Sequence, residues 1–155
     1  LRNHGQKTKT EIVLYGWNSR LDNIHAAVLN VKLKYFPSWI ERRRQIAKMY
    51  DEGLASIPQI VTPPKQDEDH FDTYQNYVVR AEKRDELIEH LKARGVETLV
   101  KDPIPNHKHS KLGLDYYSLP VTERLAKEVI SLPLYVELED EEAQYVIEQV
   151  RNFYL

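Results

Sequence analysis

The sequence predicts an α/β protein in which a small, mostly antiparallel three-stranded sheet is packed by helices and is preceded by two long N-terminal helices. Apolar residues recur at helical spacing over residues 19–54 and again over residues 140–154. Between these segments, short β-prone runs alternate with stretches rich in proline and glycine. The sequence holds no internal repeat, so a small sheet covered by helices is the arrangement that buries these apolar faces.

The N-terminal part is predicted to hold a polar loop and two helices. Residues 7–14 form the loop, which leads into the extended run Ile12–Tyr15. Ser19–Asp22 matches a capping box, so the first helix is expected to begin near Ser19. Pro37 is tolerated in the first turn of a helix and predicts the start of a second helix that runs to Leu54. The apolar stripes of both helices would be exposed here if they normally dock on a domain outside this chain.

The remaining residues predict an alternation of short strands and helices. Prolines and acidic residues mark residues 56–72 as a loop. The elements predicted after it are strand 74–81, helix 83–94 closed by Gly95, strand 96–100, a long loop over 102–119, helix 122–130, strand 131–134 and helix 140–154. We therefore expect a loop and interdomain helices over residues 1–54 and a small C-terminal domain over residues 55–155.

Composition favours an ordinary globular protein and excludes several classes. The 155 residues carry a net charge of −2, which gives no electrostatic case for binding nucleic acid or an anionic membrane. No apolar run approaches the roughly 20 residues that span a bilayer, and the N-terminal sequence does not resemble a signal peptide. The absence of cysteine excludes disulfides, thiolate metal sites and a cysteine nucleophile. We expect a cytoplasmic protein, and a chain that begins at Leu1 is expected to be a piece of something longer or processed.

Two patterns suggest other functions and are rejected on their spacing. Consecutive residues fan around a helix by about 100° each, so Arg42–Arg44 cannot form one nucleic-acid-binding stripe, and a solvated helix with one arginine at an interface is favoured. His107 and His109 have no cysteine nearby and only Asp102 and Asp115 as acidic neighbours, so no metal site is predicted. No nucleophile-elbow or zinc-helix motif indicates a hydrolase.

The segment before the first predicted helix has the residues of an anion site. Gly16 provides a turn, Asn18 an amide and Arg20 a guanidinium, immediately before an amphipathic helix. Backbone N–H groups at a helix start, helped by such side chains, bind anions. A purely structural role for Asn18 as a turn residue is the alternative that the residues alone leave open.

Six segments together resemble the DegT/StrS family of nucleotide-sugar aminotransferases, in the family's order and over nearly the whole chain. They are Leu1–Gly5, Tyr15–Ala27, the arginine-rich Trp39–Ala47, the Pro-x-His loop Ile104–His107, Leu119–Ala126 and Ile130–Tyr135. The resemblance implies the C-terminal part of a fold-type-I aminotransferase that uses pyridoxal 5'-phosphate to transfer an amino group, usually from glutamate, to a keto-sugar nucleotide. It also implies that the Schiff-base lysine and the aspartate facing the pyridine nitrogen lie upstream of Leu1. This chain would then hold no catalytic residue and would be inactive alone.

The same resemblance assigns roles to three residues. Asn18 would donate its amide N–H to the cofactor phosphate of the other subunit in a homodimer. Arg20 would support this turn through an ion pair with Asp22 or with a partner carboxylate. His107 would contact the sugar nucleotide or help to shape its pocket. The residues beside His107 depart from the family's pattern, which leaves the identity of the sugar open.

Two hypotheses from different classes follow. The chain is the C-terminal part of a sugar aminotransferase, acting in the homodimer of a longer enzyme or together with a separate N-terminal half. Alternatively, it is a non-catalytic regulatory or interaction domain that keeps the aminotransferase fold. The reading frame upstream of Leu1 distinguishes them, because only the enzyme needs a suitably placed lysine there.

Overall fold

The computed structural model describes residues 3–67 and 69–155, so Leu1 and Arg2 of the first family motif lie outside the described residues. The chain folds as two compact units, Leu1–Ser38 and Trp39–Leu155. The division falls inside helix α2 (Phe36–Leu54), because the buried side chains of that helix belong to the core of the second unit. The predicted division at residues 54/55 is a different one, and it stays a prediction about the domains.

The first unit begins with an irregular hairpin. Two isolated antiparallel bridges tie it together, from Asn3 to Asn18 and from Gln6 to Ile12. Gly5 sits at the closest approach of the two sides, with a φ of +69° that favours glycine. A Cβ atom there would stand 1.7 Å from the carbonyl oxygen of Leu14, so the hairpin requires glycine at this position.

Helix α1 (Asn23–Leu33) completes the first unit and begins later than predicted. The predicted capping box Ser19–Asp22 is wrong: Asp22 is the residue before the helix, its backbone is extended, and its side chain makes no capping hydrogen bond. The first helical hydrogen bond runs from the N–H of Ala26 to the carbonyl of Asp22, at 2.9 Å. No residue of α1 is buried, so its apolar side chains are exposed in this chain, whereas Ile46, Ala47, Tyr50 and Leu54 of α2 are buried.

The second unit is built on a three-stranded antiparallel sheet, which confirms the predicted sheet type. Its strands are β1 (Ile60–Val61), β2 (Tyr77–Ala81) and β3 (Val129–Leu132), in the order β1-β2-β3. Ile60 lies opposite Ala81, and Val79 lies opposite Ile130. All four side chains are buried, so the register places one face of the sheet in the core.

One predicted strand is replaced by another. Residues 96–100 join the sheet only through a single bridge between Leu99 and Ser131. Val96 is instead used to end the preceding helix, since its N–H donates to the carbonyl of Leu91 at 3.0 Å and its side chain is buried. The sheet is completed by β1, which lies in the segment predicted as a loop. The prolines around Ile60–Val61 favoured that loop prediction, although these two residues pair with β2.

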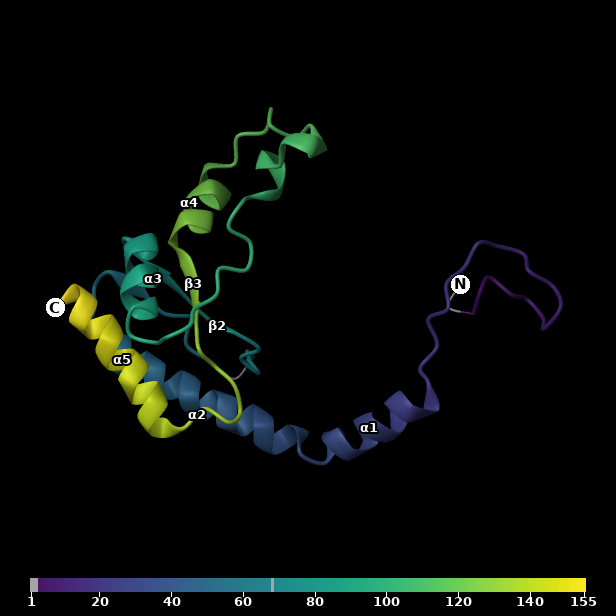
Figure 1. Cartoon of the computed structure of the whole chain (residues 1–155), viewed down its shortest axis with the longest axis horizontal. Helices are drawn as coiled ribbons and strands as arrows, with labels where there is room; N and C mark the ends of the chain where they lie inside the picture. Colours follow the sequence, from purple (N-terminus) through teal and green to yellow (C-terminus); the bar gives the residue numbers. More distant parts are fainter. Residues whose placement is uncertain (1–2, 68) are drawn as a thin grey trace. The chain divides into compact units, whose positions relative to one another are not determined.

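Three helices pack around the sheet and supply about half of the buried core residues. Besides α2 they are α3 (Arg84–Lys92) and α5 (Asp140–Tyr154), close to their predicted bounds. Figure 1 shows α2 and α5 running side by side. They are in close contact at Gly53, where a Cβ atom would stand 2.7 Å from two side-chain carbons of Ile147. None of the helices among the described residues is long and apolar enough to cross a membrane.

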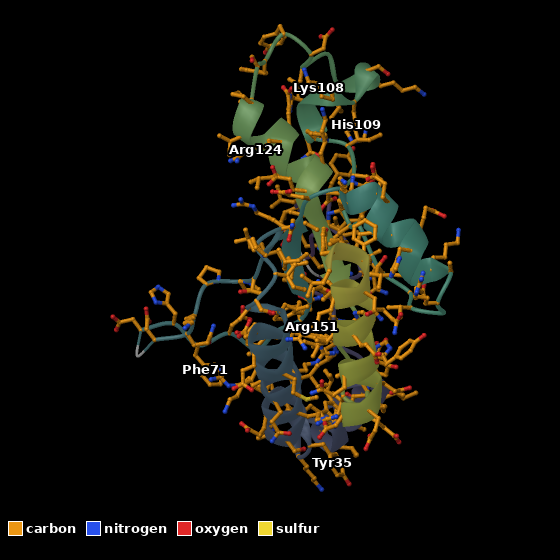
Figure 2. All side chains as sticks on the ribbon, turned by 90° about the vertical axis from the view of Figure 1, so that its left-hand side faces the viewer. Tyr35, Phe71, Lys108, His109, Arg124 and Arg151 are labelled. Atoms are coloured by element: carbon orange, nitrogen blue, oxygen red, sulfur yellow. The ribbon has the colours of Figure 1, made fainter. Side chains whose placement is uncertain are left out.

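The three consecutive arginines of α2 all donate hydrogen bonds within the second unit. The expectation of a solvated helix with one arginine at an interface is therefore wrong. Their guanidinium groups donate to the Asp140 carboxylate (Arg42, 2.6 Å), the Tyr74 carbonyl (Arg43, 2.9 Å) and the Asp72 carbonyl (Arg44, 2.9 Å). The Arg44 guanidinium also lies 4.2 Å from the ring centre of Phe71, on the projecting loop seen in Figure 2. The fan of three side chains therefore ties α2 to two segments, residues 72–75 and residues 134–140.

Residues 102–128 form a lobe that extends beyond the sheet, away from α2 and α5 (Figure 1). It contains two single-turn 3₁₀ helices, η1 (Asn106–Lys108) and η2 (Ser110–Leu112), and helix α4 (Pro120–Glu128). Helix α4 begins and ends two residues before the predicted helix 122–130. The following strand, β3, therefore also begins two residues earlier than predicted, at Val129.

Candidate functional site

The turn that carries Asn18 is held by its backbone and leaves its side chains open. The Asn3–Asn18 bridge fixes the backbone at Asn18, whose side chain is exposed. Within residues 3–67 and 69–155, the Asn18 amide makes no hydrogen bond and the exposed Arg20 makes no ion pair. The predicted pairing of Arg20 with Asp22 is not formed, because the Asp22 carboxylate lies 3.6 Å from the Nδ1 of His25.

The helix start is separate from this turn. Residues 19–22 lie between Asn18 and the first residue of α1, so Asn18 does not cap the helix. The first-turn N–H groups of α1 receive no side-chain cap and remain available as donors. The positive end of the helix dipole therefore lies near Asn23. Asn18 can contribute only its own side-chain amide, from a loop whose backbone is held by the bridge to Asn3.

The chemistry of these groups suits a phosphate monoester. Asn18 offers a neutral N–H donor, Arg20 a permanent positive charge, and the start of α1 a set of backbone donors. The acidic side chain among them, that of Asp22, faces a histidine. The residues of the turn thus fit the phosphate of pyridoxal phosphate as far as one chain supplies its ligands.

His107 lies in the second unit and is buried, with 4% of its surface exposed. Its Nε2 is 3.0 Å from the Oε1 of Glu123, in the first turns of α4. The same oxygen accepts from the Lys108 ammonium at 3.3 Å and from the N–H of Leu119 at 3.3 Å. The hydrogen bond from His107 is the main reason that the pKa of Glu123 falls to about 2, with Leu119 and Lys108 adding to it.

This geometry restricts what His107 can contact. An ionised carboxylate only accepts, so Nε2 must carry the proton that faces Glu123. Among the described residues, the only buried side-chain polar atom without a partner is the Gln59 oxygen. The Nδ1 of His107, for which those residues offer no partner, therefore reaches solvent, and a substrate contact would have to use that atom.

His109 and the rejected metal site are the other features that the sequence singled out. His109 is exposed and is seen on the lobe beside Lys108 and Arg124 in Figure 2. No group of three potential metal-ligating side chains occurs in the part of the chain that the structure describes. The site residue that sequence reasoning missed is Glu123. Its position in the first turn of the predicted helix was the available signal, because a glutamate there can accept a hydrogen bond from the backbone N–H that precedes the helix.

Comparison with known proteins identifies the family. The model of the DegT/DnrJ/EryC1/StrS aminotransferase family matches residues 1–151. The chain is 39% identical to the "Pleiotropic regulatory protein" of Geobacillus stearothermophilus, over 99% of this chain and 42% of that protein. It is 40% identical to the dTDP-3-amino-3,4,6-trideoxy-alpha-D-glucose transaminase of Streptomyces venezuelae, over 99% of this chain and 41% of that protein.

The fold agrees with the sequence match. The crystal structure of S. venezuelae DesV in complex with a ketimine intermediate superposes with a TM-score of 0.91 at 39% identity, over 99% of this chain and 42% of DesV. The chain thus spans about two fifths of the length of the relatives it matches. The chain belongs to the DegT/DnrJ/EryC1/StrS aminotransferase family.

Proposed function

We propose that the chain is the C-terminal part of a cytoplasmic, pyridoxal-phosphate-dependent aminotransferase that moves an amino group from glutamate to a keto-sugar nucleotide. The observation that carries the proposal is the backbone-held turn at Asn18, whose donors are unpaired within the described residues of a chain from this family. Bound pyridoxal phosphate supplies the electron sink for the transfer. The lysine that holds it belongs to a segment outside this sequence.

In this proposal Asn18 holds the cofactor phosphate of the partner subunit in a homodimer, and Arg20 supports the turn that presents Asn18. The amide of Asn18 donates one hydrogen bond without adding a charge. Exposure of Asn18 and Arg20 supports this role, because a side chain that serves another subunit must be open in its own. His107 belongs to the sugar-nucleotide side of the site, as a direct contact through Nδ1 or through the shape of its lobe.

The first test is the substitution Asn18→Ala in the enzyme that carries the upstream lysine. Loss of one hydrogen bond to a charged acceptor corresponds to about 1–3 kcal/mol, or roughly a 5- to 150-fold rise in the cofactor dissociation constant. Asn30→Ala, at an exposed position of α1, is the matched control and should leave the constant unchanged. Equal cofactor affinities for the two variants would refute the phosphate role of Asn18.

A mixing experiment tests whether Asn18 acts across subunits. One full-length variant lacks the upstream lysine, and the other carries Asn18→Ala. In a mixed dimer, the lysine of the second variant meets the intact Asn18 of the first, so random mixing restores about a quarter of all sites. Visible absorbance of bound cofactor measures this recovery. If mixing restores nothing while each homodimer still assembles, Asn18 serves its own subunit.

A second candidate function is a non-catalytic regulatory role. The names of two relatives favour it, since one is called a pleiotropic regulatory protein and another a sensory transduction protein of erythromycin biosynthesis. Expression of the complete reading frame decides between the candidates. A lysine-bearing upstream segment together with amino transfer from glutamate supports the enzyme, whereas a frame without such a lysine supports the regulator.

A further inference from the structure

One carboxylate connects the two ends of an otherwise loosely held segment. Glu123 Oε1 accepts hydrogen bonds from His107 in η1 and from the N–H of Leu119 at the start of α4. His107 and Glu123 are 16 positions apart, and residues 109–119 lie between them. Holding two such distant positions together removes the entropy of an open loop.

The intervening segment has few other restraints. Its side chains are exposed except for the half-buried Leu114. Its backbone hydrogen bonds, within the described residues, are local: the N–H of Leu112 donates to His109 and that of Tyr117 donates to Leu114, at 3.0 and 3.1 Å. A segment with little buried apolar surface and only local hydrogen bonds opens easily unless its ends are fixed.

His107 differs from the other histidines in a way that suits such a tie. Of the six histidines, all of which lie among the described residues, His107 alone is buried. The side chain of His107 is 5% exposed and that of Glu123 is 33% exposed, whereas the Lys108 side chain on the same carboxylate is 42% exposed. A charge-assisted bond from a buried, rigid donor is the stronger of the two.

We propose that His107 is a positioning residue, whose bond to Glu123 latches η1 onto α4 and thereby holds residues 109–119 in one conformation. The proposal does not rest on the proposed function, because it concerns the order of the lobe in this chain. In this role the Nε2 of His107 donates to Glu123, and its Nδ1 remains accessible to solvent.

The two ring nitrogens can be separated by substitution. The amide nitrogen of glutamine reaches the place of Nε2, and that of asparagine reaches only the place of Nδ1. Amide hydrogen exchange of Leu112 and Tyr117 in the 155-residue chain reports on the segment. We expect these amides to exchange roughly tenfold faster or more in His107→Asn, and to return towards the original rate in His107→Gln.

Three controls keep the test decisive. The N–H of Leu87, bonded at 2.9 Å inside α3, should keep its exchange rate in every variant that retains the fold. Lys108→Ala should change the rates less than twofold, because an exposed ion pair contributes little. If His107→Asn fails to fold, Glu123→Gln replaces it, since it keeps an acceptor and loses the charge, and a smaller acceleration is expected.

Two outcomes would overturn the proposal. Unchanged exchange at Leu112 and Tyr117 in both His107→Asn and Glu123→Gln would mean that the segment is held by something else. Equal acceleration in His107→Asn and His107→Gln would mean that ring packing, and not the Nε2 hydrogen bond, orders the lobe. Neither outcome depends on cofactor or substrate, so each is distinct from a failure of the proposed enzyme activity.

Discussion

Gly53 of α2 lies against Ile147 of α5, and Gly53→Ala tests that contact. The added methyl would meet Cδ1 and Cγ2 of Ile147 at 2.7 Å, whereas real Cβ contacts are at least 3.0 Å. The helices or the buried isoleucine must therefore give by about 0.3 Å beside the half-buried Gly53. Overpacking of this kind costs about 1–3 kcal/mol.

An opposing effect reduces the expected loss. Alanine is better than glycine in a helix interior by up to about 1 kcal/mol. We therefore expect a net destabilisation of about 1 kcal/mol, within roughly 0–2 kcal/mol, in urea unfolding of the 155-residue chain followed by circular dichroism. In the background Ile147→Val, which removes Cδ1, the penalty should shrink by at least about 0.5 kcal/mol.

Gly95→Ala is the matched control for this pair. A Cβ atom at Gly95 meets nothing within 4 Å, but its φ of +76° opposes any side chain, so the expected loss of about 1–2 kcal/mol comes from the backbone alone. Ile147→Val should leave that loss unchanged. Stabilisation by Gly53→Ala to the full helix-propensity value would refute the close packing of α2 on α5.

Three further predictions concern other contacts. Gly5→Ala should abolish the N-terminal hairpin, seen as lost exchange protection of the Val13 N–H that donates to Gly5, because a Cβ would stand 1.7 Å from a backbone oxygen. Tyr77→Phe removes the hydroxyl that donates to Asp51 at 2.6 Å, so it should destabilise the chain by about 1.5–3 kcal/mol and raise further the pKa of Asp51, already raised by burial, in an NMR titration. The pKa of Glu123, about 2 when folded against an ordinary 4.5, means that its contribution to stability is complete above pH 4.5 and is lost as the pH falls towards 2; Glu123→Gln should remove this part of the acid dependence of urea unfolding.

Local signals in the sequence were sufficient for the helices of the second unit and for the sheet type. The apolar spacing of α5, the proline in the first turn of α2 and the left-handed Gly95 after α3 act over a few residues, so each could be recognised from its neighbours alone. The family resemblance was equally available, because it depends on the order of short motifs, and the match over residues 1–151 confirms it.

The failures occur where the local signal does not decide the structure. The Ser19–Asp22 pattern predicted a helix start, but residues 19–22 have no regular secondary structure and the backbone of Asp22 is extended. Residues 96–100 were β-prone, but the N–H of Val96 donates to Leu91 at the end of α3, and Ile60–Val61 pairs with β2 as the remaining strand of the sheet. The pairing of Ile60–Val61 with Arg80–Ala81 joins positions about 20 apart, over which local propensity carries no information, whereas Val96 is held by Leu91, five positions before it.

By itself the sequence determined the family, the types of most elements and the residues that offer donors to a phosphate, because each of these depends on residue type and short spacing. Only the tertiary structure decided which strands pair, that the three arginines of α2 bind residues 72–75 and 134–140, and that the Nε2 of His107 faces Glu123. The physical reason is that a hydrogen bond or a close contact between distant residues depends on their positions in space, which chain closure and packing set together.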